Sequence, residues 1–236
     1  MNRTQRSKHG GFTLIELAVV LVIIGLILGA ILKGQDLILN ARAKKFANWV
    51  KGWQTLQLTH LDRKGRYAGD QVEVLTDGGG AHRGDGTIGN NSETLSYNAE
   101  FTSAKGFLDV PSTNIVLGNH NFYMYMGNDS PSGGTNRGNV IVVTIVGNAG
   151  TPTAIGQDTI PYFEMFDAMI DGTAEAGAGR VRAISASGTS VTFTSGGIVH
   201  ATTAADGVNE ISAAGTDWGA SHAGMVYYFD RDPGSL

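Results

Sequence analysis

The chain has 236 residues, a formal net charge of −4, 42% hydrophobic residues and no cysteine. This composition describes a foldable chain of one or two domains and excludes disulfides, thiolate metal sites and a cysteine nucleophile. Its 34 glycines are about twice the usual share, and most of them follow residue 65, which predicts a loop-rich β region.

The first predicted element is an apolar helix near the N-terminus. Residues 12–32 contain one charged residue, Glu16. At about 1.5 Å per residue this helix would be roughly 31 Å long, which matches the roughly 30 Å hydrocarbon core of a bilayer. A secretory signal peptide is cut after its apolar region, whereas here the small-residue site, Gly10-Gly11, precedes it. Cleavage at that site would leave the apolar helix in the mature protein.

The stretch GFTLIEL at residues 11–17 resembles the processing site of type IV pilins and type II secretion pseudopilins. The resemblance implies that prepilin peptidase cleaves after Gly11, that Phe12 becomes the N-methylated N-terminus, and that Glu16 acts in assembly. It also implies a bacterial inner-membrane protein with its leader in the cytoplasm, which later joins a periplasmic or extracellular filament. The implied partners are the bilayer, the inner-membrane assembly platform, and copies of itself or other pilins in a helical filament.

Glu16 has more than one interpretation. An acid at the centre of a membrane helix costs on the order of 2.5–3.5 kcal/mol, so a partner is expected. The resemblance supplies the amine of Phe12 on a neighbouring subunit. Alternatively, the carboxylate reaches the lipid headgroups or becomes protonated.

The apolar helix is expected to continue into an amphipathic stem. No proline occurs from residue 33 to residue 64, and apolar residues recur there at spacings of three and four, which places them on one helical face: Phe46, Trp49, Val50, Trp53, Leu56 and Leu61. We therefore predict one helix over residues 12–64 that ends at Gly65. The predicted organisation is a leader at 1–11, a helix at 12–66 whose transmembrane part is 12–32 and whose stem is 33–66, and a head at 67–236.

The head is predicted to be rich in β-strands. Short β-branched or aromatic runs bounded by turn residues occur at residues 71–76, 122–126, 140–146, 181–185, 191–194, 198–203 and 225–229. Residues 160–170 suit a short helix with Pro161 in its first turn and a stop at Asp171-Gly172. The fold class is therefore α+β and type IV pilin-like, with a long N-terminal helix packed on a mainly antiparallel sheet.

Charge is divided unevenly along the chain. Residues 33–66 have a net charge of +6 and residues 67–236 a net charge of −12. A cationic stem and an anionic head suit staggered subunits in which one head meets the next stem. Alternatively, the stem cations contact anionic lipid headgroups. An anionic head also argues against nucleic-acid binding, which needs clustered lysine and arginine.

Few patterns indicate other chemistry. Residues 84–89 match G-x-G-x-x-G but lack the strand before and the helix after that a dinucleotide-binding site needs. Residues 85–88 resemble the middle of a calcium loop but lack the ligand spacing of an EF-hand. A looser calcium site formed by Asp77, Asp85 and Glu93 is one interpretation, and a glycine-rich turn whose aspartate caps its own backbone is the other. The histidines lack metal-site spacing, and Asp230 and Asp232 are expected to be solvated loop acids.

Two function classes remain. In the first, the chain is a structural subunit of a pilus or pseudopilus. In the second, it is a minor or tip subunit whose head binds a surface, a carbohydrate or a secretion substrate. No enzyme motif is present in the sequence, so we predict that the chain is not an enzyme.

Overall fold

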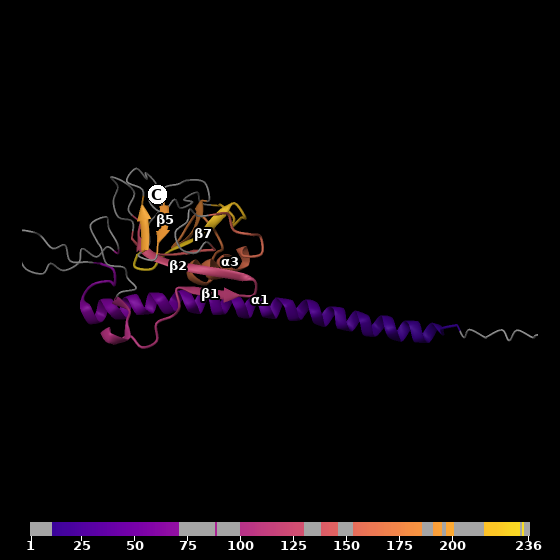
Figure 1. Cartoon of the computed structure of the whole chain (residues 1–236). Helices are drawn as coiled ribbons and strands as arrows, with labels where there is room; N and C mark the ends of the chain where they lie inside the picture. The colour runs from indigo at the N-terminus through magenta and orange to yellow at the C-terminus, as the bar shows by residue number, and fades with distance from the viewer. Residues whose placement is uncertain are drawn as a thin grey trace, which may run out of the picture. The chain divides into compact units, whose positions relative to one another are not determined.

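The computed structural model describes residues 11–70, 88, 100–129, 138–145, 153–185, 191–194, 197–200, 215–231 and 233. The chain divides into two compact units, Met1–Ala41 and Arg42–Leu236. The long helix α1, Leu14–Lys64, contributes to both units, whereas the sheets and the helix α3, Ile160–Asp171, belong to the second unit (Figure 1). This is the α+β, pilin-like architecture that the sequence predicts.

Helix α1 has 51 residues and begins two residues later than predicted, because Thr13 takes the position before the first helical residue. It ends where expected. Gly65 has a φ of +74°, and its N–H donates to the Leu61 carbonyl at 2.7 Å. A left-handed glycine after the last turn is a common helix stop, and Arg63 and Lys64 complement the negative helix end.

The second unit contains a five-stranded antiparallel sheet in the order β1-β2-β3-β7-β4. Its strands are β1 (Asn114–Leu117), β2 (His120–Asn128), β3 (Asn139–Thr144), β4 (Val181–Ser185) and β7 (His222–Tyr228). A separate pair is formed by β5 (Val191–Thr194) and β6 (Gly197–His200). Every residue of β3 and of β7 is buried, as expected for strands covered on both faces.

Most of the predicted strands are confirmed within a few residues. The run at 71–76 lies outside the described residues, and β1 was not predicted. A signal for β1 exists in Gly118-Asn119, a two-residue turn that joins β1 to β2. Gly118 has a φ of +64°, which favours glycine because it has no Cβ.

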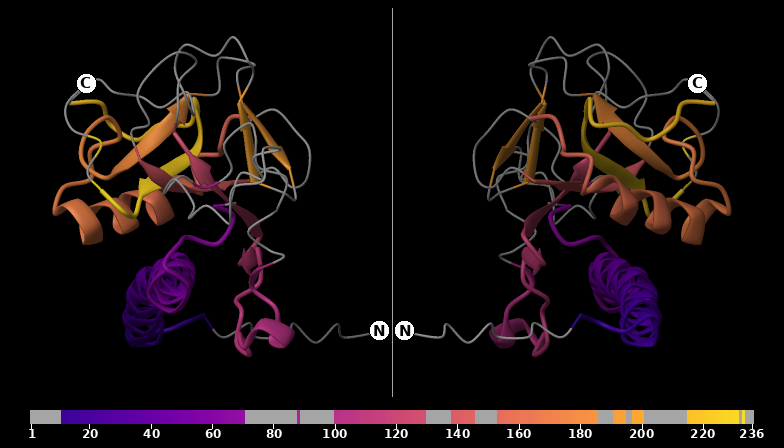
Figure 2. Two further views of the ribbon diagram at one scale, coloured as in Figure 1. Left: turned by 90° about the vertical axis from the view of Figure 1, so that its left-hand side faces the viewer. Right: turned by 90° about the vertical axis from the view of Figure 1, so that its right-hand side faces the viewer.

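One face of the sheet packs against α1 and the helix α3, Ile160–Asp171 (Figure 2). The contact is aromatic: the ring of Phe46 on α1 lies 5.0 Å from that of Phe122 on β2 and 5.7 Å from that of Phe163 on α3. Trp49 on α1 donates its indole N–H to the Ser112 carbonyl at 2.7 Å. The predicted apolar face of the stem is therefore confirmed at Phe46, Trp49, Val50 and Trp53, which are buried. Further along the helix the prediction is wrong, because Leu56 and Leu61 are half-buried and the buried residues are Gln57 and His60.

Helix α3 matches the prediction at both ends. Pro161 lies in its first turn, and Gly172 caps its C-terminus with a φ of +83°. The side chain of Thr159 does not cap the helix but donates its hydroxyl to the Gly156 carbonyl at 2.7 Å.

The prediction that Asp230 is a solvated loop acid is wrong. Its side chain is 6% exposed, and its two carboxylate oxygens accept hydrogen bonds from the backbone and side-chain N–H groups of Asn139, at 3.0 and 2.8 Å. The turn after β7 brings this acid back onto the start of β3, a pairing that requires the sheet order. Asp232 lies outside the described residues.

Candidate processing and assembly site

The expected processing residues lie at the start of α1. Gly11 and Phe12 precede the helix, both are exposed, and the Phe12 side chain is 84% exposed. Glu16 lies in the first helical turn. The chain therefore brings the expected scissile bond, the expected new N-terminus and the expected assembly acid into about one turn of helix.

Thr13 and Glu16 form a reciprocal pair of hydrogen bonds at this end of the helix. The backbone N–H of Thr13 donates to Glu16 Oε2 at 2.8 Å, and the backbone N–H of Glu16 donates to Thr13 Oγ1 at 3.3 Å. This is a capping box, which satisfies two N–H groups that the helix itself leaves without a partner. The sequence contains a signal for this cap, Thr-x-x-Glu before an apolar run, although the cap is not among the predictions above.

The helix that follows is exposed on all sides within its own chain. Every residue from Leu14 to Lys33 is exposed. Among the described residues, α1 is long and apolar enough to cross a membrane, and its most apolar window buries none of its residues within the chain. Contiguous apolar surface of this extent marks a membrane or an interaction site.

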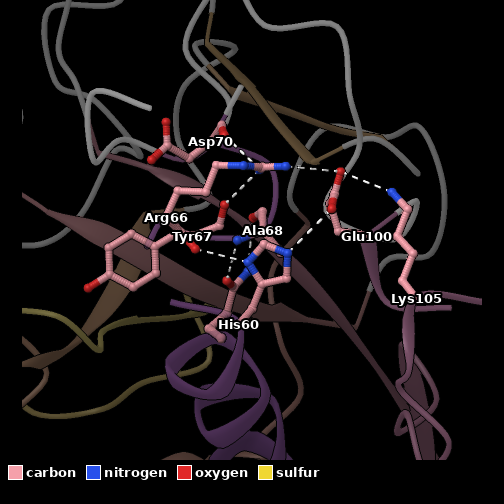
Figure 3. Close-up of polar contacts among 8 residues, drawn as sticks. His60, Arg66, Tyr67, Ala68, Asp70, Glu100 and Lys105 are labelled. Atoms are coloured by element: carbon pink, nitrogen blue, oxygen red, sulfur yellow. Dashed lines mark hydrogen bonds and ion pairs between the residues drawn. The ribbon is translucent and has the colours of Figure 1, made fainter. Parts of the chain in front are cut away.

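A second polar cluster holds the far end of α1 to the head (Figure 3). His60, 1% exposed, lies with Nδ1 2.9 Å from the Arg66 carbonyl oxygen. Because that oxygen only accepts, Nδ1 carries a proton. The other ring nitrogen lies 3.3 Å from Glu100 Oε2.

Glu100 also pairs with two longer side chains. Its Oε1 lies 3.4 Å from Arg66 Nη2 and 3.1 Å from Lys105 Nζ. Burial raises the pKa of the Glu100 carboxyl, but the hydrogen bonds and charges of Lys105, Arg66 and His60 together outweigh burial, so its pKa lies below its usual value. The ionised acid thus joins the end of α1 to the segment around η1 (Ser103–Lys105).

Gln57 completes this junction. Its side-chain N–H₂ donates to the Ala68 carbonyl at 3.1 Å, and its carbonyl accepts the Ala68 N–H at 2.9 Å. A fully buried amide with such a partner fixes the turn after the helix, since an unpaired amide there would be costly. This cluster could not be predicted from the sequence, because Gln57, His60 and Glu100 have no motif in common.

The predicted calcium site and the three tryptophans are the other candidates. Asp77, Asp85 and Glu93 lie outside the described residues, so the calcium site stays a prediction. Among the residues that the structure describes, no group of three or more His, Asp or Glu side chains could hold a metal ion. Trp49, Trp53 and Trp218 are buried packing residues.

Comparison with known proteins identifies the N-terminal region. Residues 6–32 match the model of the prokaryotic N-terminal methylation motif, the hallmark of type IV pilins, pseudopilins and related prepilin-like proteins. The resemblance of residues 11–17 to a prepilin processing site is thereby confirmed as a match to this motif. No curated protein and no solved structure matches it.

Proposed function

We propose that this chain is a structural subunit of a type IV pilus or pseudopilus, made as a precursor and polymerised through α1. The observation that carries the proposal is the exposure of α1. The part of α1 that lies within the methylation motif is apolar, and the most apolar window of the helix contains no buried residue. Such a segment needs lipid around it first and the helices of other subunits later.

In this proposal, prepilin peptidase cuts between Gly11 and Phe12 and methylates the Phe12 amine. The basic leader, residues 1–11, lies in the cytoplasm, and the rest of the chain crosses the inner membrane. An inner-membrane platform then inserts the subunit into a filament of copies of itself or of other pilins. The role is structural and not catalytic, as is typical of the proteins that carry this motif.

Glu16 supplies the selective contact of assembly. Its hydrogen bonds from the neutral Thr13 stabilise the carboxylate but leave its net negative charge in place. A charge among apolar side chains is costly, and the new amine of Phe12 on a neighbouring subunit would compensate it. Attraction between these two groups fixes the axial position of one helix against the next.

The charges of the stem supply a second, weaker contact. Lys33, Lys44 and Lys45 are exposed on α1, and the head is strongly anionic. Screening at physiological salt limits such surface attractions to about a Debye length, roughly 8 Å. They therefore favour head-to-stem stacking only between adjacent subunits.

The test separates the charge of Glu16 from its capping role. Glu16→Gln removes the charge, whereas Thr13→Val removes the capping hydroxyl and keeps the acid. We expect both variants to reach the membrane fraction, Glu16→Gln to lose filaments or N-methylation, and Thr13→Val to retain most of both. Normal filament yield and methylation in Glu16→Gln would refute the pairing, and an equal loss in both variants would assign the effect to the cap.

The second candidate role is that of a minor or tip subunit whose head binds a surface or a secreted substrate. A polar pocket on the head, described below, favours it. Stoichiometry separates the two roles, because a major subunit dominates sheared filaments and a minor one is scarce in them.

A further inference from the structure

The second unit contains a polar pocket beside the β1–β2 hairpin. Its volume is about 380 Å³, within the range of about 300–1,000 Å³ typical of small-molecule sites. Its lining residues come from three places in the chain: the hairpin turn and β2, the residue that follows β3, and the loop before α3. The side chains that the argument uses are Asn119, His120, Asn121, Tyr123, Ile145 and Asp158.

A directed chain of hydrogen bonds holds the β2 side of this pocket in place. Ser112 Oγ donates to Asn114 Oδ1 at 2.8 Å, Asn114 Nδ2 donates to Asn121 Oδ1 at 3.3 Å, and Asn121 Nδ2 donates to the Tyr123 phenol oxygen at 2.7 Å. The register of the hairpin pairs Asn114 with Tyr123. Because the phenol oxygen accepts in this chain, its own O–H is left to donate elsewhere. The pocket is thus pre-formed, which lowers the entropy cost of binding.

On another side of the pocket, an imidazole faces a carboxylate. His120 Nε2 lies 3.2 Å from Asp158 Oδ2, and the His120 ring packs edge-on against Tyr162, 6.2 Å between centroids. The Asp158 side chain is 70% exposed, so its carboxylate keeps acceptor sites that face solvent. Gly156 leaves room for that carboxylate, since a Cβ there would lie 2.5 Å from Asp158 Oδ1.

The chemistry of this lining selects a class of ligand. Among the described residues that line it, none is lysine or arginine, which disfavours phosphate and sulfate, and the carboxylate of Asp158 already faces an imidazole. The described residues also hold no group of three metal-binding side chains. The polar groups of the lining are amides, a phenol, an imidazole and a carboxylate, which between them can both donate and accept hydrogen bonds, and the apolar Ile145 lies beside them. Sugar hydroxyls donate and accept in the same way, and the C–H faces of a sugar ring are apolar.

We propose that this pocket binds a neutral carbohydrate of one or two sugar rings. Tyr123 donates to a ring hydroxyl, Asp158 accepts from another, and Asn119 and Asn121 contribute amide contacts. The lining contains none of the expected processing and assembly residues, Gly11, Phe12 and Glu16. Carbohydrate binding would give the head a means of recognising a glycan-bearing surface.

The test uses the full chain in micelles of a phosphocholine detergent, because sugar-headed detergents would compete. Methyl α-mannoside, lactose and N-acetylglucosamine are titrated separately and followed by saturation-transfer NMR. We expect at least one to bind saturably. Tyr123→Phe and Asp158→Asn should each weaken its binding about 3- to 10-fold, the loss of one hydrogen bond. Asp109→Asn, a matched change at an exposed acid outside the pocket, should leave binding unchanged.

Both substitutions are close in shape to the native side chains, and unchanged circular dichroism spectra check that the head is folded. The proposal is overturned if none of the three sugars binds, or if the two pocket variants bind as tightly as the wild type. It is equally overturned if inorganic phosphate binds in their place. Loss of filaments in the pocket variants without any sugar binding would identify the pocket as a contact between subunits. None of these results bears on cleavage after Gly11, so the two proposals fail separately.

Discussion

Asp167 on α3 makes the stability of the head depend on pH. Its side chain is fully buried, and its Oδ2 accepts the indole N–H of Trp218 at 2.8 Å. Its other oxygen, Oδ1, is buried with no hydrogen-bond partner among the described residues. Burial, the largest cause, raises the pKa of this carboxyl from 3.8 to about 7; nearby Asp171 raises it further, and the Trp218 hydrogen bond opposes the shift.

The sign follows from proton binding. The folded state holds the Asp167 proton more tightly than the unfolded chain, so its contribution is fully present below about pH 3.8 and is lost as pH rises through about 7. At about 1.36 kcal/mol per pKa unit, the full span is roughly 4 kcal/mol, of which about 2–3 kcal/mol falls between pH 5 and pH 8.5. Asp167→Asn removes this ionisation and keeps an oxygen that accepts from Trp218.

The assay is urea unfolding of the full chain in detergent micelles at several pH values. We expect the free energy of unfolding of the wild type, relative to Asp167→Asn, to fall by about 2–3 kcal/mol from pH 5 to pH 8.5. Burial lowers the pKa of His222, whose ring contacts Trp218 edge-on, so the stability that this histidine contributes is lost as the pH falls, which is the opposite trend. Because both proteins contain His222, the difference between them reports Asp167. Parallel pH profiles would refute the reasoning.

Three further predictions concern the termini of α1 and the core. Gly11→Val should block maturation, because a branched side chain replaces the residue before the expected scissile bond; a product of wild-type mass would contradict the cleavage assignment. Glu100→Gln should lower the free energy of unfolding by about 1–3 kcal/mol at pH 7. The pKa of Glu100 is lowered in the folded state, so its contribution to stability is lost below about pH 4.5, and the variant should lose less stability there than the wild type. Urea titrations at pH 7 and pH 3.5 check this, and equal pH profiles of the two proteins would argue against the contacts of Glu100 with His60, Arg66 and Lys105. Phe46→Ala should cost about 3–5 kcal/mol, because its ring is fully buried among Phe122, Phe163 and Phe166, whereas Leu108→Ala, at an 84% exposed position, should cost under about 0.5 kcal/mol by the same assay.

Helix α1 and most strands follow from local sequence. The spacing of Phe46, Val50 and Trp53 and the stop at Gly65 depend only on helical periodicity and on glycine's backbone freedom. Likewise, β3 and β7 are short β-branched or aromatic runs between turn residues. Strand β1 was missed because four residues carry little signal, although the Gly118-Asn119 turn marks it.

Contacts between distant residues could not be predicted in this way. Asp230 accepts from Asn139 only because the sheet places β7 beside β3, and neither residue belongs to a motif. The same holds for His60 with Glu100, which lie 40 residues apart. By contrast, the residues expected to be processed, Gly11, Phe12 and Glu16, are local in sequence, and the matched methylation motif spans all three.

The central claim is that α1 begins as a membrane anchor of a precursor and becomes the N-terminus of a mature subunit. Intact-mass measurement of the chain from the membrane fraction of its native host tests this directly. We expect a mass that lacks residues 1–11 and carries one added methyl group on Phe12. A chain of full precursor mass, with residues 1–11 still attached in the functional protein, would contradict the account.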